Sequence, residues 1–239
     1  MPCEEIERGA FDTPEFAAWS AAYVLFAHIT TQVKGDKHPD LLRQKGGLGP
    51  PYVAMLDARG SVVGKLQETR DVAGFTAMAA KAAVCAAELA TLATAAAAGD
   101  VAARRRLFVR RLELGAYATM DDANADLAGF DDADRAAIDQ PLYDFSVRLR
   151  IDAIGSKRDS AACGKAFALE IRAGRTFKGD LQRLQSYWVF AAEHARSTED
   201  VLVAERAVAA IDELLPANEH ARQFTAQLRA EIAVWKGRK

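Results

Sequence analysis

The sequence predicts an α/β segment followed by an all-α segment, so that the chain is mostly helical overall. Two short apolar runs with β-forming residues, at 23–27 and 52–57, predict strands within residues 1–67. From residue 70 onward, apolar residues recur at helical spacing, and glycines stand where helices should stop. Alanine, the strongest helix former, makes up roughly a fifth of the chain.

Length, charge and cysteine content exclude several classes of protein. The 239 residues, 50% of them hydrophobic and 27% charged, allow a real core and exclude a disordered or collagen-like chain. A net charge of -2 implies no global attraction to nucleic acid or anionic membrane, so we expect neither as a partner. Three scattered cysteines are too few for a disulfide scaffold or a zinc cluster. We therefore expect no metal and no cofactor.

The first 67 residues are predicted to mix helices and strands. A short helix covers 3–10, and Thr13 caps a second helix in which Pro14 takes the first position. The apolar run at 23–27 predicts a buried strand. A single helical turn is expected at 40–44.

A hairpin is predicted next. A loop rich in glycine and proline at 45–51 leads into an apolar strand at 52–57. The turn at 58–60 ends on a glycine, which can adopt a positive φ, and 61–66 forms the returning strand.

The second half is predicted to form helix after helix. The expected helices are 70–98, 101–114, 120–128, 132–154, 158–173, 179–195, 198–214 and 217–236. The expected stop signals are Gly99, Gly115, Gly129, Gly155 and Gly174, and the expected start signals are Thr119, Ser197 and Pro216. Repeated helix pairs indicate a bundle or a tetratricopeptide-like stack, although no clean 34-residue signature is present.

Two stretches carry a resemblance to a known family. Gly49-Pro50-Pro51-Tyr52 and the following residues through Asp57 and Gly60 resemble the thioredoxin-like pattern G-x-P-T-x-x-x-x-D-x-x-G, in which the proline is cis. Met1-Pro2-Cys3 resembles the last three residues of the W-C-x-P-C motif of thioredoxins. The resemblance covers residues 1 to about 95.

The resemblance implies a thiol–disulfide oxidoreductase acting on protein thiols and disulfides. Cys3 would be the resolving cysteine, which attacks the mixed disulfide and releases the product, and Pro51 would be the cis proline that shapes the substrate groove. The thioredoxin-like domain would cover 1–98. The α-helical domain, 99–239, would bind a partner protein or form a homodimer.

The chain departs from the family pattern at its start. The nucleophilic residue of the motif would precede Met1 by one position, and the central strand before it, which should lie between 23–29 and 52–57, is missing. We therefore expect an N-terminally truncated version of a longer protein. If the missing nucleophile were selenocysteine, its UGA codon would be taken for a stop and Met1 for the start. A mis-set start in a gene with an ordinary cysteine fits equally well.

Several alternatives remain open at this point. The chain could be a redox-inactive thioredoxin-like scaffold that acts as an interaction module through its helical domain.

The sequence as it stands predicts a cytoplasmic protein. If an upstream signal was lost, the protein would be periplasmic. Cys85 and Cys163 are interpreted as small core residues. The arginines at 104–111 and the acidic stretch at 121–134 are interpreted as charged faces that complement each other, in preference to an anion or nucleic-acid patch.

Overall fold

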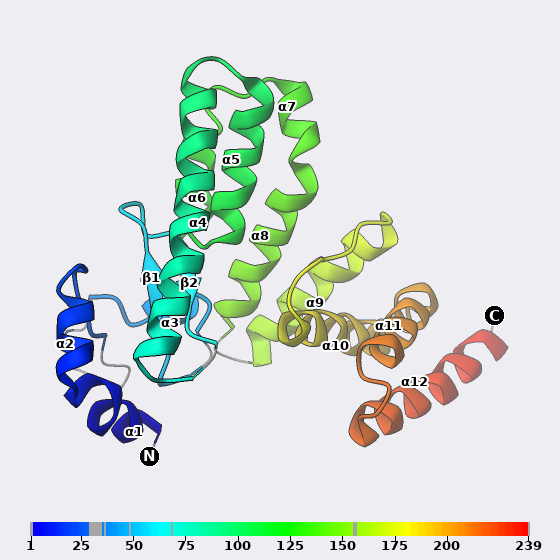
Figure 1. The fold of residues 1–239 in the computed structure, drawn as a ribbon. Coiled ribbons are helices and arrows are strands. Elements are labelled where there is room, and N and C mark those ends of the chain that lie inside the picture. Colours follow the sequence, from blue (N-terminus) through cyan, green and yellow to red (C-terminus); the bar gives the residue numbers. More distant parts are fainter. Residues whose placement is uncertain are drawn as a thin grey trace. The chain divides into compact units, whose positions relative to one another are not determined.

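The computed structural model describes residues 2–28, 35, 37–47, 49–67, 69–154 and 157–238. The chain is mostly helical, with 68% helix and 3% strand, as the sequence predicted (Figure 1). It divides into two compact units, 1–142 and 143–239. The domain boundary expected after residue 98 lies inside the first unit, because the helices on either side of it pack against each other there.

The N-terminal helices follow the local signals of the sequence. They are α1 (Pro2–Arg8), the 3-10 helix η1 (Ala10–Asp12) and α2 (Pro14–Ser20). The Thr13 hydroxyl accepts a hydrogen bond from the Phe16 backbone N–H at 3.1 Å, and Pro14 takes the first position of α2. The predicted cap is therefore confirmed.

The segment at 23–27 corrects the prediction of a buried strand. Its backbone forms no strand pairing with any described residue. Val24 is 98% exposed and Phe26 is 72% exposed. A strand is stable only when a neighbouring strand supplies hydrogen-bond partners for its backbone, and the apolar pattern alone cannot supply them.

The predicted hairpin is present. Strands β1 (Ala54–Leu56) and β2 (Val62–Lys65) pair antiparallel, and Gly60 in the turn has a φ of 79°. Among the described residues these two strands form the whole sheet.

The first unit contains further helices after α2. They are α3 (Leu41–Gln44), α4 (Val72–Ala97), α5 (Val101–Glu113), α6 (Met120–Asp126) and α7 (Asp132–Ala137). The long helix α4 packs against β2 and α5. Gly99 and Gly115 have positive φ angles of 93° and 65° at the ends of α4 and α5, and Thr119 forms a capping box at the start of α6. These three signals are confirmed.

Helix α4 has the length and apolar composition that could also cross a membrane. Only 28% of its most apolar window is buried, and its exposed positions carry mainly alanine and threonine. A single helix of this length and composition is weak evidence for a membrane span.

The single helix predicted at 132–154 is two helices. Helix α7 ends at Ala137, and α8 (Asp139–Asp152) begins one residue after Ile138. Pro141 explains the break, because it has no N–H to donate to the Ala137 carbonyl and its ring would clash there. The prediction of one continuous helix overlooked this proline.

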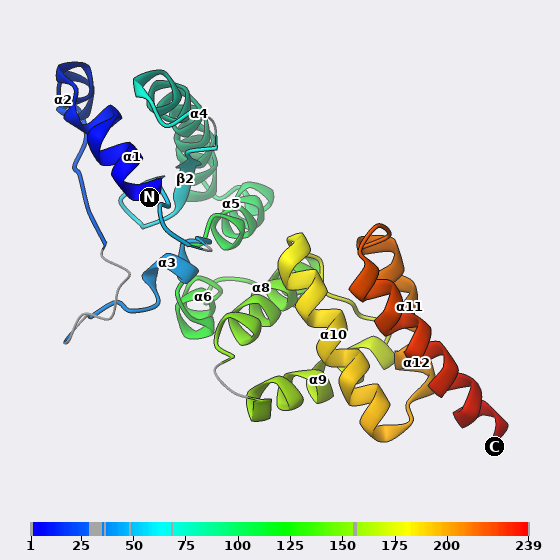
Figure 2. The ribbon, with the colours of Figure 1, turned by 90° about the horizontal axis from the view of Figure 1, so that it is seen from below.

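The second unit contains the rest of α8 and four helices. They are α9 (Lys157–Arg172), α10 (Leu181–Thr198), α11 (Val201–Leu214) and α12 (Glu219–Gly237). Each packs against the next in chain order (Figure 2). Gly174 has a φ of 84° after α9, as predicted, whereas Ser197 lies inside α10 and the cap of α11 is Asp200. Gly155 lies outside the described residues.

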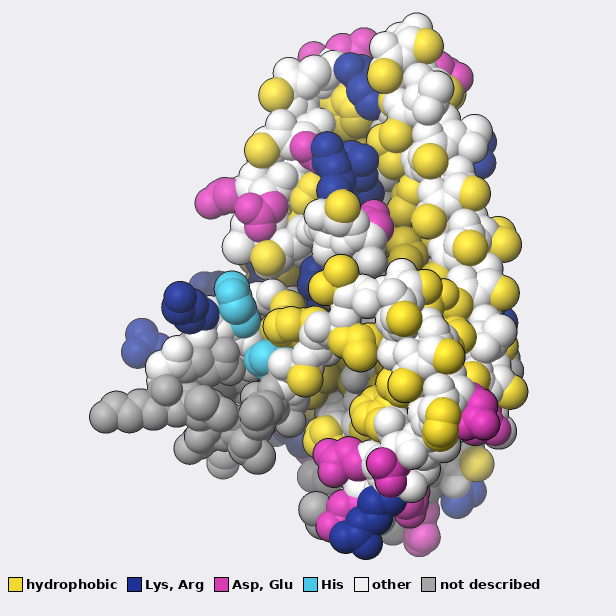
Figure 3. Space-filling model, turned by 60° about the vertical axis from the view of Figure 1, so that its left-hand side comes forward, with side chains coloured by type: hydrophobic (Ala, Val, Ile, Leu, Met, Phe, Trp, Pro, Cys, Tyr) yellow, Lys and Arg dark blue, Asp and Glu magenta, His cyan; other side chains and the backbone are white. Residues whose placement is uncertain are grey.

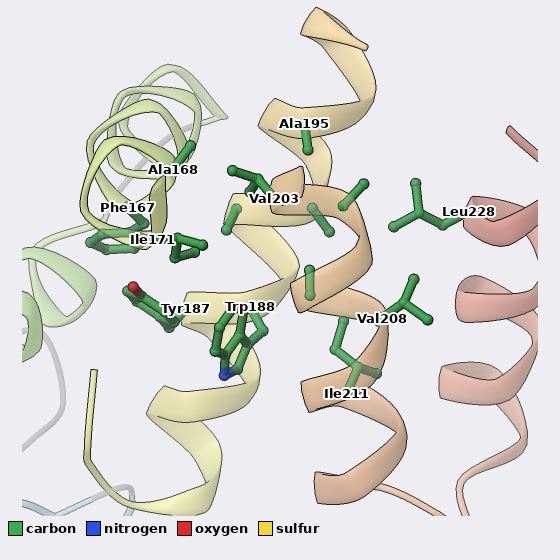
Figure 4. Close-up of a cluster of buried hydrophobic side chains, with 14 of the residues drawn as sticks. Phe167, Ala168, Ile171, Tyr187, Trp188, Ala195, Val203, Val208, Ile211 and Leu228 are labelled. Carbon is green, nitrogen blue, oxygen red and sulfur yellow. The ribbon is translucent and has the colours of Figure 1, made fainter. Parts of the chain in front are cut away.

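The core of this second unit is built from small and large side chains in alternation. Tyr187, Ala191 and Ala195 of α10 are fully buried, and α11 and α12 add further apolar residues, among them Val203 and Leu228 (Figure 4). The alanines let neighbouring helices approach closely, while the aromatic rings fill the space between them. The prediction of helices alone beyond residue 100 holds for all described residues.

Candidate functional site

Cys3, the first candidate residue, lies in the first turn of α1. Its thiol is half-buried and forms no disulfide, and it has no hydrogen bond with any described residue. The position leaves the sulfur accessible to a second thiol or a disulfide.

The segment that follows Cys3 is anchored to the segment that follows Pro51. Ala10 of η1 and Phe16 of α2 share one hydrophobic cluster with Phe75 of α4, and Val53 and Met55 at β1 pack against the same cluster. The rings of Phe16 and Phe75 meet edge to face, 5.1 Å apart. The elements next to the two candidate residues therefore belong to one core.

Pro51, the second candidate residue, lies immediately before β1. The Pro50–Pro51 peptide bond is cis, as the sequence pattern predicted. Lys45 fastens the loop before it, because its Nζ donates to the carbonyls of Gly60 and Gly115 at 2.7 and 2.9 Å. The Tyr52 hydroxyl donates to the Lys45 carbonyl and ties the loop to the start of the hairpin.

Lys45 and Tyr52 were not among the site residues expected from the sequence. Burial lowers the pKa of the Lys45 ammonium, and the charge of Asp57 partly offsets the shift. Burial raises the pKa of the Tyr52 phenol to about 12, so its proton stays available for the bond to the Lys45 carbonyl. A lysine before two glycines and a tyrosine after two prolines are common loop residues. Only the contacts with Gly60 and Gly115 distinguish them.

One side of the candidate site is open. Among the described residues β1 pairs with β2 alone, so its other edge keeps its backbone groups unpaired. The segment from Val24 to Phe26 is exposed and forms no strand pairing with any described residue. Figure 3 shows a face of the molecule on which many hydrophobic side chains remain at the surface. Unpaired edges and exposed β-forming residues are what a further strand would cover.

The other two cysteines have the structural role that the sequence predicted. Cys85 packs against the cluster formed by α4 and α5, and Cys163 packs against the core of the second unit. Burial raises the pKa of the Cys163 thiol, which makes it a poor nucleophile. The Arg110 Nη2 atom lies 4.0 Å from the Cys85 sulfur.

The basic and acidic stretches complement each other, as predicted. The buried Asp134 carboxylate binds Arg104 at 2.8 Å and lies 3.6 Å from Arg105. Asp126 pairs with Arg111 at 3.6 Å and accepts a hydrogen bond from the Tyr117 hydroxyl at 2.7 Å. Burial, followed by the hydrogen bond to Asp126, raises the pKa of the Tyr117 phenol.

The described residues include no group of three or more His, Cys, Asp or Glu side chains that could hold a metal ion. Comparison of the chain with protein-family models, curated proteins and solved structures found no match. The chemistry of Cys3 and the geometry around Pro51 are therefore the basis for assigning a function.

Proposed function

We propose that residues 1–98, within the first unit, form a thioredoxin-like thiol–disulfide oxidoreductase domain in which Cys3 is the resolving cysteine of a C-x-P-C or selenocysteine-x-P-C motif. The observation that carries the proposal is the common core of η1, α2, β1 and α4, which couples the Cys3 segment to the Pro51 segment. The cis Pro50–Pro51 bond and the hairpin that follows agree with the family pattern at Pro51.

In the proposed reaction, the first residue of the motif holds a substrate sulfur in a mixed disulfide. The Cys3 thiolate attacks the sulfur or selenium of that residue and forms a new bond to it. The bond to the substrate sulfur breaks, and its electron pair leaves with the substrate, which takes up a proton. The enzyme ends oxidised, with Cys3 in a disulfide or selenenylsulfide, and the substrate ends reduced.

The open edge of β1 and the exposed segment at 23–26 also support this proposal. In the thioredoxin-like pattern a strand lies between these two segments and leads directly into the nucleophile. A chain extended upstream by roughly 20 to 30 residues would supply both the strand and the nucleophile.

Insulin-disulfide reduction tests the proposal. The 239-residue chain should show negligible turnover, because Cys3 has no second thiol or selenol at motif spacing. A chain with the natural upstream residues and a Cys one position before Met1 should be active. Its Cys3→Ser variant should accumulate the mixed disulfide with substrate, visible by mass spectrometry. Turnover by the 239-residue chain that survives Cys3→Ser would refute the assignment.

The alternative function is a redox-inactive scaffold that acts through its helices. The consecutive packing of α9, α10, α11 and α12 favours it, because stacked helix pairs present extended surfaces to partner proteins. The nucleotide sequence upstream of the Met1 codon separates the two functions. An in-frame Cys or TGA codon preceded by a strand-like stretch favours the oxidoreductase, and its absence favours the scaffold.

A further inference from the structure

The first unit has a groove in which positive charge is concentrated. It measures about 280 Å³ and lies between α4, α5 and the junction of α7 with α8. We call it the arginine groove, and its lining residues are Glu88, Arg105, Arg106, Val109, Arg110, Ala137 and Ile138. Three arginines and one glutamate therefore contribute to the lining of a single small groove.

The acidic side chains around the arginine groove form ion pairs with arginines other than Arg106. Asp134, which pairs with Arg105 at 3.6 Å, is bound more closely by Arg104 at 2.8 Å. Arg110 binds Glu88 at 3.3 Å and Glu113 at 2.6 Å, so the Glu88 charge is neutralised from within the groove. These pairs leave little negative charge for the remaining guanidinium.

Arg106 is the guanidinium that stays unmatched. It is exposed and forms no ion pair with any described residue. It lies one helical turn before Arg110 on the same face of α5, and like charges at this spacing destabilise a helix slightly. Arg106 therefore carries a charge that no carboxylate among the described residues neutralises and that a bound anion would neutralise.

The floor of the arginine groove is apolar. Val109, Ala137 and Ile138 contribute aliphatic surface, and Ile138 is only 1% exposed. A guanidinium can bind a carboxylate or phosphate through two parallel hydrogen bonds, and an aliphatic floor favours an apolar group attached to that anion. We propose that the arginine groove binds a small organic oxyanion, a carboxylate or phosphate on a compact apolar body.

The size and lining of the groove argue against a nucleic acid. A volume of about 280 Å³ is at the lower end of small-molecule sites and suits a ligand about the size of one ring. Among the described residues, no aromatic side chain lines the groove, whereas single-stranded nucleic acid usually stacks its bases on aromatic rings. This site is separate from Cys3 and does not depend on the redox proposal.

Calorimetric titration of the full chain tests the site with phenyl phosphate, benzoate and inorganic phosphate as probes. We expect saturable binding of phenyl phosphate or benzoate at physiological salt, and weaker binding of inorganic phosphate, which has no apolar body. A preference between the first two probes tells a phosphate ligand from a carboxylate ligand. Arg106→Gln should raise the Kd by about tenfold or more, because it removes a charge-assisted hydrogen bond.

Arg70→Gln is the matched control. It removes the same charge from a half-exposed arginine of the same unit outside the groove, and should leave the Kd unchanged. Circular dichroism should show the same helix content for both variants, because Arg106 and Arg70 lie outside the core. No saturation with either organic probe up to about 10 mM would overturn the proposal. An equal loss of binding in the two variants would overturn it as well.

Discussion

Apolar side chains are buried in the second unit but exposed in the N-terminal segment at 23–27, although the two regions have similarly apolar sequences. In the second unit Tyr187 and Ala191 of α10 are fully buried, because α9 and α11 pack on either side of that helix. In the N-terminal segment, Val24 and Phe26 stay exposed although their sequence is just as apolar. A helix satisfies its own backbone and needs only a partner for one face. A strand needs backbone partners as well.

The same substitution in the two regions tests this contrast most strongly. Phe167→Ala in α9 should destabilise the second unit by about 3–5 kcal/mol, because Phe167 is 1% exposed and packs on Tyr187. Phe26→Ala should change stability by no more than about 0.5 kcal/mol. Native-state hydrogen exchange, which reports on each unit separately, measures both effects. A large loss at Phe26 would mean that the segment is covered in solution.

The next largest loss of stability is expected from a substitution that disturbs the close packing of α9 against α10 in the second unit. A Cβ at Gly164 of α9 would lie 2.3 Å from the Phe190 carbonyl oxygen of α10. Gly164→Ala should therefore cost about 1–3 kcal/mol by forcing the two helices apart. Gly237→Ala is the control, because no described residue outside its own helical turn places an atom within 4 Å of the added Cβ, and alanine favours a helix. Thermal unfolding of the two variants should move in opposite directions, or the second should not move.

In the N-terminal segment, helix α2 should depend on its N-terminal cap, Thr13. Thr13→Ala should cost about 1 kcal/mol, because it removes the cap on the Phe16 N–H. Thr13→Ser should keep most of the stability, since its hydroxyl can accept the same bond. Hydrogen exchange in α2 measures the difference. Equal exchange in the two variants would contradict a capping role for Thr13.

The smallest expected effect depends on pH and concerns the cap of α10. Burial raises the pKa of Asp180, but its hydrogen bonds and ion pair with Arg183 outweigh this and hold the pKa below the usual 3.8. The negative charge of Asp180 therefore stabilises the folded protein when the pH is above the ordinary aspartate pKa. This stabilisation is lost as the pH falls through the lowered pKa of the folded state.

Asp180→Asn should accordingly cost about 0.5 kcal/mol at neutral pH, since the carboxylate is half-exposed and asparagine still caps the helix. Urea unfolding at several pH values should show the stabilities of the two proteins converging as the pH falls below the ordinary aspartate pKa of 3.8. A constant difference across this range would mean that the charge of Asp180 is not responsible.

The sequence by itself determined the features that depend on neighbouring residues. Gly99, Gly115 and Gly174 end helices because a left-handed residue costs glycine little, and Thr13 and Thr119 begin helices because their hydroxyls reach the next turn. The cis bond before Pro51 also followed from a local pattern. Pro141 is an equally local signal, and it predicts the break between α7 and α8 in place of the single helix expected at 132–154.

Tertiary structure alone decided which distant groups meet. The 23–27 segment stays exposed because no described strand pairs with it, and a pattern of apolar residues contains no information on a partner's backbone. Lys45 reaches Gly115 across 70 positions of sequence, and Asp134 is shared by Arg104 and Arg105 on another helix. Arg106 stands out in the arginine groove only after these pairs are assigned, because the strength of an ion pair depends on distances that the fold sets.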